Sequence, residues 1–235
     1  QRQMCIRDSP YMDNYNYYKC MNGIIQELTG LLKTKNIGTD SDRALLLDFQ
    51  ATLETKPEKA IKLEKDALAQ IETITADNAR LVSNLHANLG GLYRMNGHPD
   101  LAREHMEKSI SLLDQFNLLH INDSIPQIAN YAMFLTEQQE PERGISELQK
   151  LSGIIKEYHS DDCLDYAKVQ ETLGTIYLMT ANLPQAKTHF KRAFKIYEKI
   201  WADEPEMIEA KYQEIQELYP QIGFCIGKTL SGLLT

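Results

Sequence analysis

The sequence predicts an all-α protein, built as a right-handed α-solenoid of antiparallel helix pairs. Apolar residues recur three or four positions apart along most of the chain, which is the spacing of one helix face. Leu81, Leu85, Leu89 and Leu92 are an example. No stretch shows the alternation typical of a half-buried strand. Breaks that contain glycine or proline separate the helical stretches, and one residue pattern repeats along the chain.

The helices are expected in pairs, and the second helix of each pair begins at a proline. Proline is tolerated in a first turn because its missing N–H would be unpaired there anyway. The expected ranges are 41–55 and 57–75, 78–96 and 99–116, 124–139 and 141–158, 162–181 and 184–201, with a further helix near 204–218. The side chains expected to cap helix starts are Asp40, Asp77, Asp123, Ser160 and Asp203.

A period of 42 residues underlies these pairs. In the first helix of a pair, Leu89-Gly90-x-x-Tyr93 returns 84 residues later as Leu173-Gly174-x-x-Tyr177, with Tyr131-Ala132-x-x-Leu135 halfway between. In the second helix, Ala102-x3-Met106 returns as Ala186-x3-Phe190, with Gly144-x3-Leu148 halfway between. One period before the earliest of these, Leu47 and Ala60 fall in the same register. Self-similarity at a fixed period of this length is typical of solenoids.

The repeated positions have a simple physical meaning. Small residues let the two helices of a pair approach closely; they are Ala60, Ala102, Gly144 and Ala186 in the second helix and Gly90, Ala132 and Gly174 in the first. A large apolar residue four positions later, Met106, Leu148 or Phe190, fills the space between one pair and its neighbour. Because one pair cannot bury both of its faces, the pairs must stack.

The order Leu-Gly-x2-Tyr followed by Ala-x3-Phe-x2-Ala resembles the tetratricopeptide repeat, whose usual period is about 34 residues. The longer period, and the segment Asn88-Leu89-Gly90-Gly91-Leu92-Tyr93, resemble the kinesin-light-chain type of this repeat. Residues 200–207 resemble its inter-repeat linker, without the usual Gly and His. The resemblance covers roughly residues 41–218 and implies an array of repeats that binds other proteins.

The repeat register predicts a single array over residues 10–235. Repeats are expected near 41–76, 77–122, 123–160 and 161–203, with partial units at 10–36 and 204–235. Residues 1–9 lack this pattern and resemble a translated transposon-end adapter from a tagmentation sequencing library. We therefore expect a metagenomic fragment whose native start is lost.

Composition and charge exclude several classes of function. The chain has 235 residues, a net charge of −8 and 25% charged residues, which is an ordinary globular composition. The acidic balance argues against nucleic-acid binding, which depends on phosphate neutralisation by Lys and Arg. No run of about 18 apolar residues is present, so no membrane span is expected. The four cysteines, Cys5, Cys20, Cys163 and Cys225, form no CxxC pair, which fits a reducing, cytoplasmic location.

No catalytic, cofactor or metal site is expected. The six histidines are scattered, and His98 and His105 lie seven residues apart without a third ligand nearby. The Gly90-Gly91 pair lies in the middle of a predicted helix and lacks the phosphate-loop pattern. Asp161 and Asp162 lie at a predicted helix start, where carboxylates stabilise the exposed N–H groups. The chain is therefore not expected to be an enzyme.

In tetratricopeptide arrays the first helix of each pair lines the concave face, so the resemblance implies a partner-binding groove there. The expected groove residues are small, polar or methionine: Asn84, Ala87, Asn88, Gly91, Arg94 and Met95; Ala129, Asn130, Met133, Thr136 and Glu137; and Lys168, Glu171, Thr172, Thr175, Leu178 and Met179. Asn88 and Asn130 share one slot, and a column of Asn side chains can pair with the backbone of an extended peptide. The alternative is that both only bond neighbouring helices.

Three functions remain open. The favoured one is a scaffold that binds a protein or peptide partner through the concave face. The second is a sensor region of a larger signalling protein, such as a signalling ATPase or a peptide-responsive transcription regulator, with its effector domain upstream of Pro10. The third is an enzyme, which needs a polar constellation that the sequence lacks. Apolar residues near both ends also predict self-association through exposed repeat ends: Tyr15, Tyr17, Tyr18, Phe224, Ile226 and Leu230.

Overall fold

The structure is a computed structural model that describes residues 14–35, 38–122 and 124–218. All regular secondary structure in these ranges is helical and forms ten helices, labelled α2 to α11. The chain divides into two compact units at Gln127, and each unit is described by itself. The all-α prediction is confirmed, whereas the continuity of one array past Gln127 stays a prediction. The adapter-like residues 1–9 and the apolar C-terminal segment lie outside the described residues.

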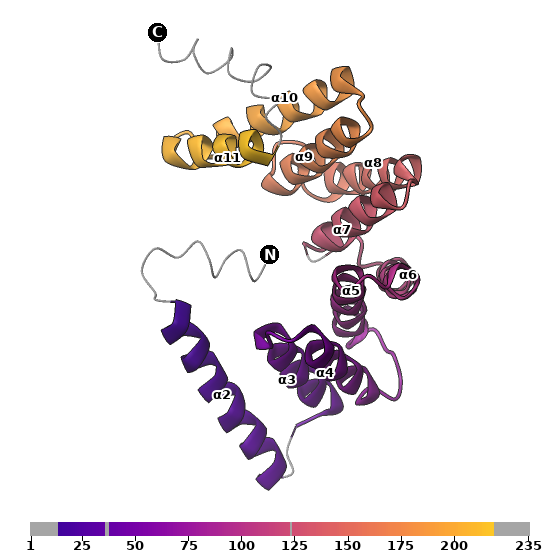
Figure 1. The fold of residues 1–235 in the computed structure, drawn as a ribbon, viewed down its shortest axis with the longest axis vertical. Coiled ribbons are helices and arrows are strands. Elements are labelled where there is room, and N and C mark those ends of the chain that lie inside the picture. Colours follow the sequence, from indigo (N-terminus) through magenta and orange to yellow (C-terminus); the bar gives the residue numbers. More distant parts are fainter. Residues whose placement is uncertain (1–13, 36–37, 123, 219–235) are drawn as a thin grey trace. The chain divides into compact units, whose positions relative to one another are not determined.

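The first unit consists of an N-terminal helix followed along the chain by two antiparallel helix pairs (Figure 1). Its helices are α2 (Asn14–Lys35), α3 (Asp40–Leu53), α4 (Pro57–Ala69), α5 (Ala79–Met95), α6 (Pro99–Gln115) and the first turn of α7 (Ser124–Glu137). The pairs are α3 with α4 and α5 with α6, and α4 also packs on α5. Helix α2 packs on α3, and the Gln50 amide donates to Thr29 Oγ1 at 3.3 Å.

The second unit repeats the same arrangement. It contains the remainder of α7, then α8 (Pro141–Tyr158), α9 (Leu164–Met179), α10 (Leu183–Ile200) and α11 (Pro205–Leu218). Helix α9 pairs with α10 and also packs on α8 (Figure 1). Helix α11 meets α10 through an edge-to-face contact between Phe194 and Tyr212, with ring centroids 5.4 Å apart.

The predicted small residues lie where helices cross most closely. Ala60, Ala102 and Ala186 are at most 2% exposed. A Cβ added at Gly90 would lie 2.6 Å from Met106 Cγ, and one at Gly144 would lie 2.6 Å from the backbone oxygen of Ala132. Backbone contact at this distance leaves no room for a side chain. The register predicted for the third pair, in which Gly144 replaces alanine, is therefore confirmed.

The turns inside three of the pairs share one backbone conformation. Gly97, Gln139 and Ala181, spaced by the repeat period, all have positive φ, at 73°, 64° and 59°. In each turn the next amide donates to a carbonyl five residues back, as from His98 to Tyr93 at 2.9 Å. This bond pattern is the Schellman motif, which satisfies the last carbonyls of a helix. A proline follows within the first two residues of the next helix, as predicted.

Three details of the predicted helices are wrong. The helix expected over 57–75 ends at Ala69, because the following residues include Ile71, Thr73 and Thr75, which have low helix propensity. Helix α3 is capped by Thr39 in a reciprocal capping box with Asp42, not by Asp40. Helix α9 begins after Cys163, whose Sγ accepts the Tyr166 amide at 3.4 Å.

The other expected capping residues within the described ranges do not cap their helices either. Asn78, not Asp77, precedes α5, and its side chain bonds the backbone of Thr73 and Thr75 in the preceding turn. Ser160 lies before the Cys163 cap, and α11 begins at Pro205, so that Asp203 is one residue too early. Asp123 lies outside the described residues. The sequence therefore located each helix start to within a few residues but not the capping atom.

Candidate functional site

The groove residues expected on α5 are tied into the first unit to different degrees. Asn84 is half-buried, and its Oδ1 accepts from the Gln127 amide at 2.6 Å. Gln127 Oε1 in turn accepts from the hydroxyl groups of Ser83 and Ser109 at 2.9 and 2.5 Å. Asn84 thus belongs to a polar network that joins α5, α6 and the first turn of α7.

Asn88 is exposed, yet its amide is already engaged. Its Nδ2 donates to Asp48 Oδ1 on α3 at 2.8 Å and to Glu64 Oε1 on α4 at 3.2 Å. The two N–H groups of the Asn88 side chain therefore bond neighbouring helices, as the alternative interpretation of this residue expected. Within the described part of the chain, its Oδ1 has no hydrogen-bond donor.

At the end of α5, Met95 is the most exposed large apolar side chain described, at 74%. Arg94 beside it is half-buried and interacts with other groups of the protein. Ala87 and Gly91 are half-buried small residues on the same helix. A Cβ added at Gly91 would meet no atom within 4 Å, so this position is open.

The groove residues expected on α7 are more open. Asn130 is exposed, and its side chain forms no hydrogen bond with any residue that the structure describes. Met133 lies three positions later on the same helix face and is half-buried. Glu137 is exposed at the end of the helix and has partners within the protein. Asn88 and Asn130 therefore occupy one repeat slot in two states, one engaged and one open.

On α9, the groove residue Glu171 is used inside the second unit. Its carboxylate accepts from Lys211 Nζ on α11 at 2.8 Å and from the Tyr197 hydroxyl on α10 at 2.6 Å. Burial opposes the charge of Lys211, but Glu171 and Glu214 together raise its pKa. Burial, followed by the charge of Glu171, raises the pKa of Tyr197. Glu171 thus anchors α11.

The remaining expected groove residues on α9 differ in exposure. Met179 is 45% exposed at the end of the helix. Lys168 lies 3.9 Å from Asp165 in a partly exposed ion pair. Thr175 is buried, and its hydroxyl donates to the backbone oxygen of Glu171 at 3.1 Å. The open positions of the second unit are therefore Asn130, Met133 and Met179.

Sequence reasoning missed a pair of buried carboxyl groups in the first unit. Asp48 and Glu64 are 4% and 2% exposed, and they face each other between α3 and α4 below Asn88. Burial, with the charge of Asp48, raises the pKa of Glu64 to about 9. The signal was in the sequence, because both residues fall in the repeat register.

A pair of histidines was also missed. Nδ1 of His86 on α5 lies 2.9 Å from Nδ1 of His105 on α6, and the His105 ring stacks on Tyr93. Burial, then the neighbouring His105, lowers the pKa of His86 to about 4. One double period later, His189 bonds Gln170 at 2.9 Å and stacks on Tyr177. The arrangement is therefore a recurring packing motif, in which His86 stands where Gln170 stands later.

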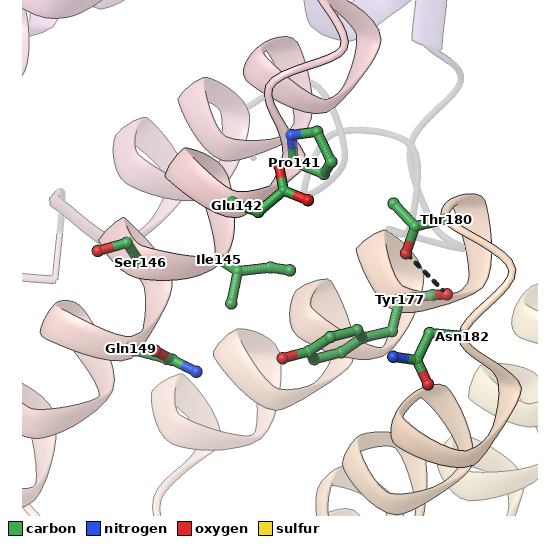
Figure 2. A pocket seen from close by; sticks show the side chains of 8 residues that line it. All are labelled: Pro141, Glu142, Ile145, Ser146, Gln149, Tyr177, Thr180 and Asn182. Atoms are coloured by element: carbon green, nitrogen blue, oxygen red, sulfur yellow. Dashed lines mark hydrogen bonds between the residues drawn. The ribbon is translucent and has the colours of Figure 1, made fainter.

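A shallow pocket of about 460 Å³ lies in the second unit (Figure 2). One wall comes from α8, and the other comes from Tyr177 and the turn that follows α9, where the Thr180 hydroxyl donates to the Tyr177 backbone oxygen at 3.1 Å. Ile145 points into the pocket toward the Tyr177 ring (Figure 2). None of the lining residues belongs to the expected groove: Pro141, Glu142, Ile145, Ser146, Gln149, Tyr177, Thr180 and Asn182.

In the described ranges, no three His, Cys, Asp or Glu side chains gather closely enough to hold a metal ion. None of the helices described is both long enough and apolar enough to cross a membrane. The clearest polar features are thus the open and engaged asparagines, the carboxyl pair and the histidine motif.

One part of the chain matches a known protein family. Residues 124–199, which cover α7 to α10, match a family model described as tetratricopeptide repeat. No curated protein matches the chain.

Solved structures are similar over most of its length. BtubC (BKLC) from P. vanneervenii is 19% identical, with a TM-score of 0.65 over 77% of this chain and 72% of that one. A kinesin light chain-type protein of Podosopora anserina with nearly identical TPR-like repeats is 16% identical, with a TM-score of 0.62 over 80% and 92% of the two chains. MamA is 16% identical, with a TM-score of 0.53 over 80% and 97%.

Residues 124–199 therefore match the tetratricopeptide repeat, and the chain has the all-α solenoid fold predicted from its sequence. The fold supports a scaffold for protein interactions in general.

Proposed function

We propose that this protein is a non-catalytic scaffold that binds an extended segment of a partner protein along the first helices of its repeats. The observation that carries this proposal is Asn130, an exposed carboxamide on α7 that makes no hydrogen bond with the described residues. A carboxamide offers both donors and an acceptor, so it can pair with both polar groups of a peptide backbone.

The apolar neighbours of Asn130 support the same proposal. Met133 lies one turn along the same face of α7, and Met179 is exposed on α9 of the same unit. Methionine is unbranched and polarizable, and it adapts to partner side chains of different shape. In the first unit, exposed Met95 lies two turns after Asn88 on the same face of α5.

The surface can be located by site-specific photo-crosslinking in the full chain. A photoreactive amino acid at Met133 should capture a partner from cell extract, whereas the same amino acid at Lys191, which is exposed on the second helix α10, should not. Capture from Lys191 with none from Met133 would place the partner on the other face and overturn the proposal.

Once a partner peptide is identified, two single variants divide the roles of the asparagines. Asn130→Ala should weaken binding by about 1–3 kcal/mol, because groups desolvated in the complex lose their bonds. Its unfolding temperature should not change, since Asn130 bonds nothing within the described chain. Asn88→Ala should both weaken binding and lower stability, because Asp48 and Glu64 lose their amide donor. Normal binding by both variants would show that neither asparagine belongs to the binding surface.

A further inference from the structure

The first repeat carries two carboxyl groups at positions where the later repeats have a contact between a small and a large residue. The slot on the first helix holds Asp48, then Gly90, Ala132 and Gly174 at intervals of 42 residues. The slot on the second helix holds Glu64, then Met106, Leu148 and Phe190 at the same interval. All four residues of the second slot are at most 4% exposed. A glutamate thus occupies a position that otherwise belongs to the apolar core.

The contacts of Glu64 are incomplete if it is ionised. Its Oε1 accepts the Asn88 amide, but its Oε2 is buried and has no hydrogen-bond donor within reach in the described structure. The carboxyl group that does lie beside it is Asp48 on α3, and it is an acceptor when ionised. Helix α5 presents only the neutral amide of Asn88, and Asp48 is the one charged group acting on Glu64 in the described residues. A buried polar atom without a partner is costly.

We propose that Glu64 stays protonated in the folded protein and donates a hydrogen bond to Asp48. The two carboxyl groups and Asn88 then form one proton-dependent link between α3, α4 and α5. The proton supplies the donor that Oε2 lacks. It also removes one of two negative charges that would otherwise face each other out of water. The burial that raises the pKa of Glu64 above its ordinary value acts in the same direction.

The link also positions Asn88. The ionised Asp48 carboxylate can only accept hydrogen bonds, so it binds the Nδ2 end of the Asn88 carboxamide, with 2.8 Å between Nδ2 and Asp48 Oδ1. The Oδ1 atom of Asn88 is then the end that faces away from Asp48. Asn88 then offers a partner an acceptor, whereas Asn130 offers both a donor and an acceptor. This consequence for binding rests on the proposed groove, but the protonation of Glu64 does not.

The protonation state can be measured directly by carboxyl ¹³C NMR of the full chain, with Glu64 assigned from the signal that disappears in Glu64→Gln. The midpoint for Glu64 is expected near 9, several pH units above the ordinary value for glutamate. A midpoint between 4 and 5 would overturn the proposal.

Thermal unfolding provides a second readout. Because folded Glu64 holds its proton to higher pH than the unfolded chain, stability should fall as pH rises from about 5 to about 9. Glu64→Gln, whose amide donates to Asp48 without titrating, should flatten this slope and be the more stable protein at pH 9. Parallel profiles for the two proteins would contradict the proton link.

A matched control exists within the chain. The double variant Asp48→Ala with Glu64→Leu copies the third repeat, where Ala132 and Leu148 fill the two slots. It should also lack the alkaline slope, and the side-chain amide protons of Asn88 should then exchange as fast as those of Asn130. In the wild type and in Glu64→Gln, the Asn88 amide should exchange more slowly. Equal exchange of both asparagines in the wild type would overturn the positioning role. If the double variant does not fold, the titration and Glu64→Gln still decide.

Discussion

The first repeat, formed by α3 and α4, and the three later repeats fill the same two slots with opposite chemistry. In the later repeats Gly90 meets Met106 and Gly174 meets Phe190, and the third repeat has an alanine and a leucine in these slots. In the first repeat Asp48 meets Glu64. The turns differ as well. The first repeat ends α3 with an extended Glu54, at φ −76° and ψ 132°, and Thr55, one period before Gly97, lacks the positive φ that Gly97, Gln139 and Ala181 share.

This difference teaches that the register of a repeat does not depend on one kind of contact. The alanine at the close helix crossing, Ala60, is kept in the first repeat and is 2% exposed. A polar contact replaces the apolar one, and it receives two hydrogen bonds from Asn88 of the next helix pair. The first repeat therefore uses hydrogen bonds from its neighbour, whereas the contacts of Gly90 with Met106 and of Gly174 with Phe190 lie within one helix pair.

The sharpest way to break this comparison is to place a glutamate in a later repeat. Phe190→Glu buries a carboxyl group beside Gly174, where no carboxyl takes the place of Asp48 and the repeat slot of Asn88 is held by Glu214. The loss of an apolar side chain and the burial of an unpaired charge should lower the free energy of unfolding by on the order of 3–5 kcal/mol. Urea unfolding measures this change. Phe190→Met, which copies Met106, should lose about 1.5 kcal/mol or less, and equal losses in both variants would contradict the argument.

A smaller effect is expected from crowding the close crossing in the fourth repeat. Ala186 is 2% exposed between α9 and α10, so Ala186→Leu should overpack the contact and reduce stability by about 1–3 kcal/mol. The matched control is Ala210→Leu on the exposed face of α11, which should change stability by less than about 0.5 kcal/mol. Unchanged unfolding of Ala186→Leu would mean that the two helices separate easily.

The turns provide a pair of changes with opposite signs. Gly97→Ala puts a side chain on a residue with φ 73° and should reduce stability by about 1 kcal/mol. Ala181→Gly relieves the same strain at φ 59° and should raise stability by a few tenths of a kcal/mol, up to about 1. Differential scanning calorimetry of both variants tests the shared geometry, and shifts of the same sign would refute it.

The histidine motif predicts a pH effect at the acid end. In the unfolded chain the pKa of His86 is about 6.5, whereas in the folded protein burial, followed by the charge of His105, lowers this pKa to about 4. Unfolding therefore binds a proton in this window, and stability should fall as pH drops from 6.5 to 4. His86→Gln, which copies Gln170, should reduce that fall in unfolding temperature. An unchanged acid profile would show that His86 titrates normally.

Much of the fold was accessible from the sequence because each repeat solves the same packing problem. The small residues, the prolines and the 42-residue period all describe backbone approach and helix starts, which local spacing encodes. The early end of α4 at Ala69 was not accessible from apolar spacing, since Ile71 and Ile74 continue the periodic pattern while β-branched residues weaken the helix.

The candidate site was only partly accessible. The repeat register put Asn88 and Asn130 in one slot, but it could not tell that Asn88 has two carboxyl partners on the preceding pair. Likewise, Glu171 has the position of a groove residue and serves to hold Lys211 of α11. Such roles depend on which side chains from other helices arrive at a position, and a period within one chain does not contain that information.

The shared Schellman turns have a consequence for changing the length of the protein. Gly97, Gln139 and Ala181 leave the chain in the same backbone conformation, and each leads into a helix with proline in its first turn. A segment cut at one of these turns therefore has ends that match another turn one period away. Duplicating residues 98–139 joins Gln139 to His98 through a junction that the backbone already adopts. Insertion or removal of one 42-residue period at these turns therefore needs no new loop conformation.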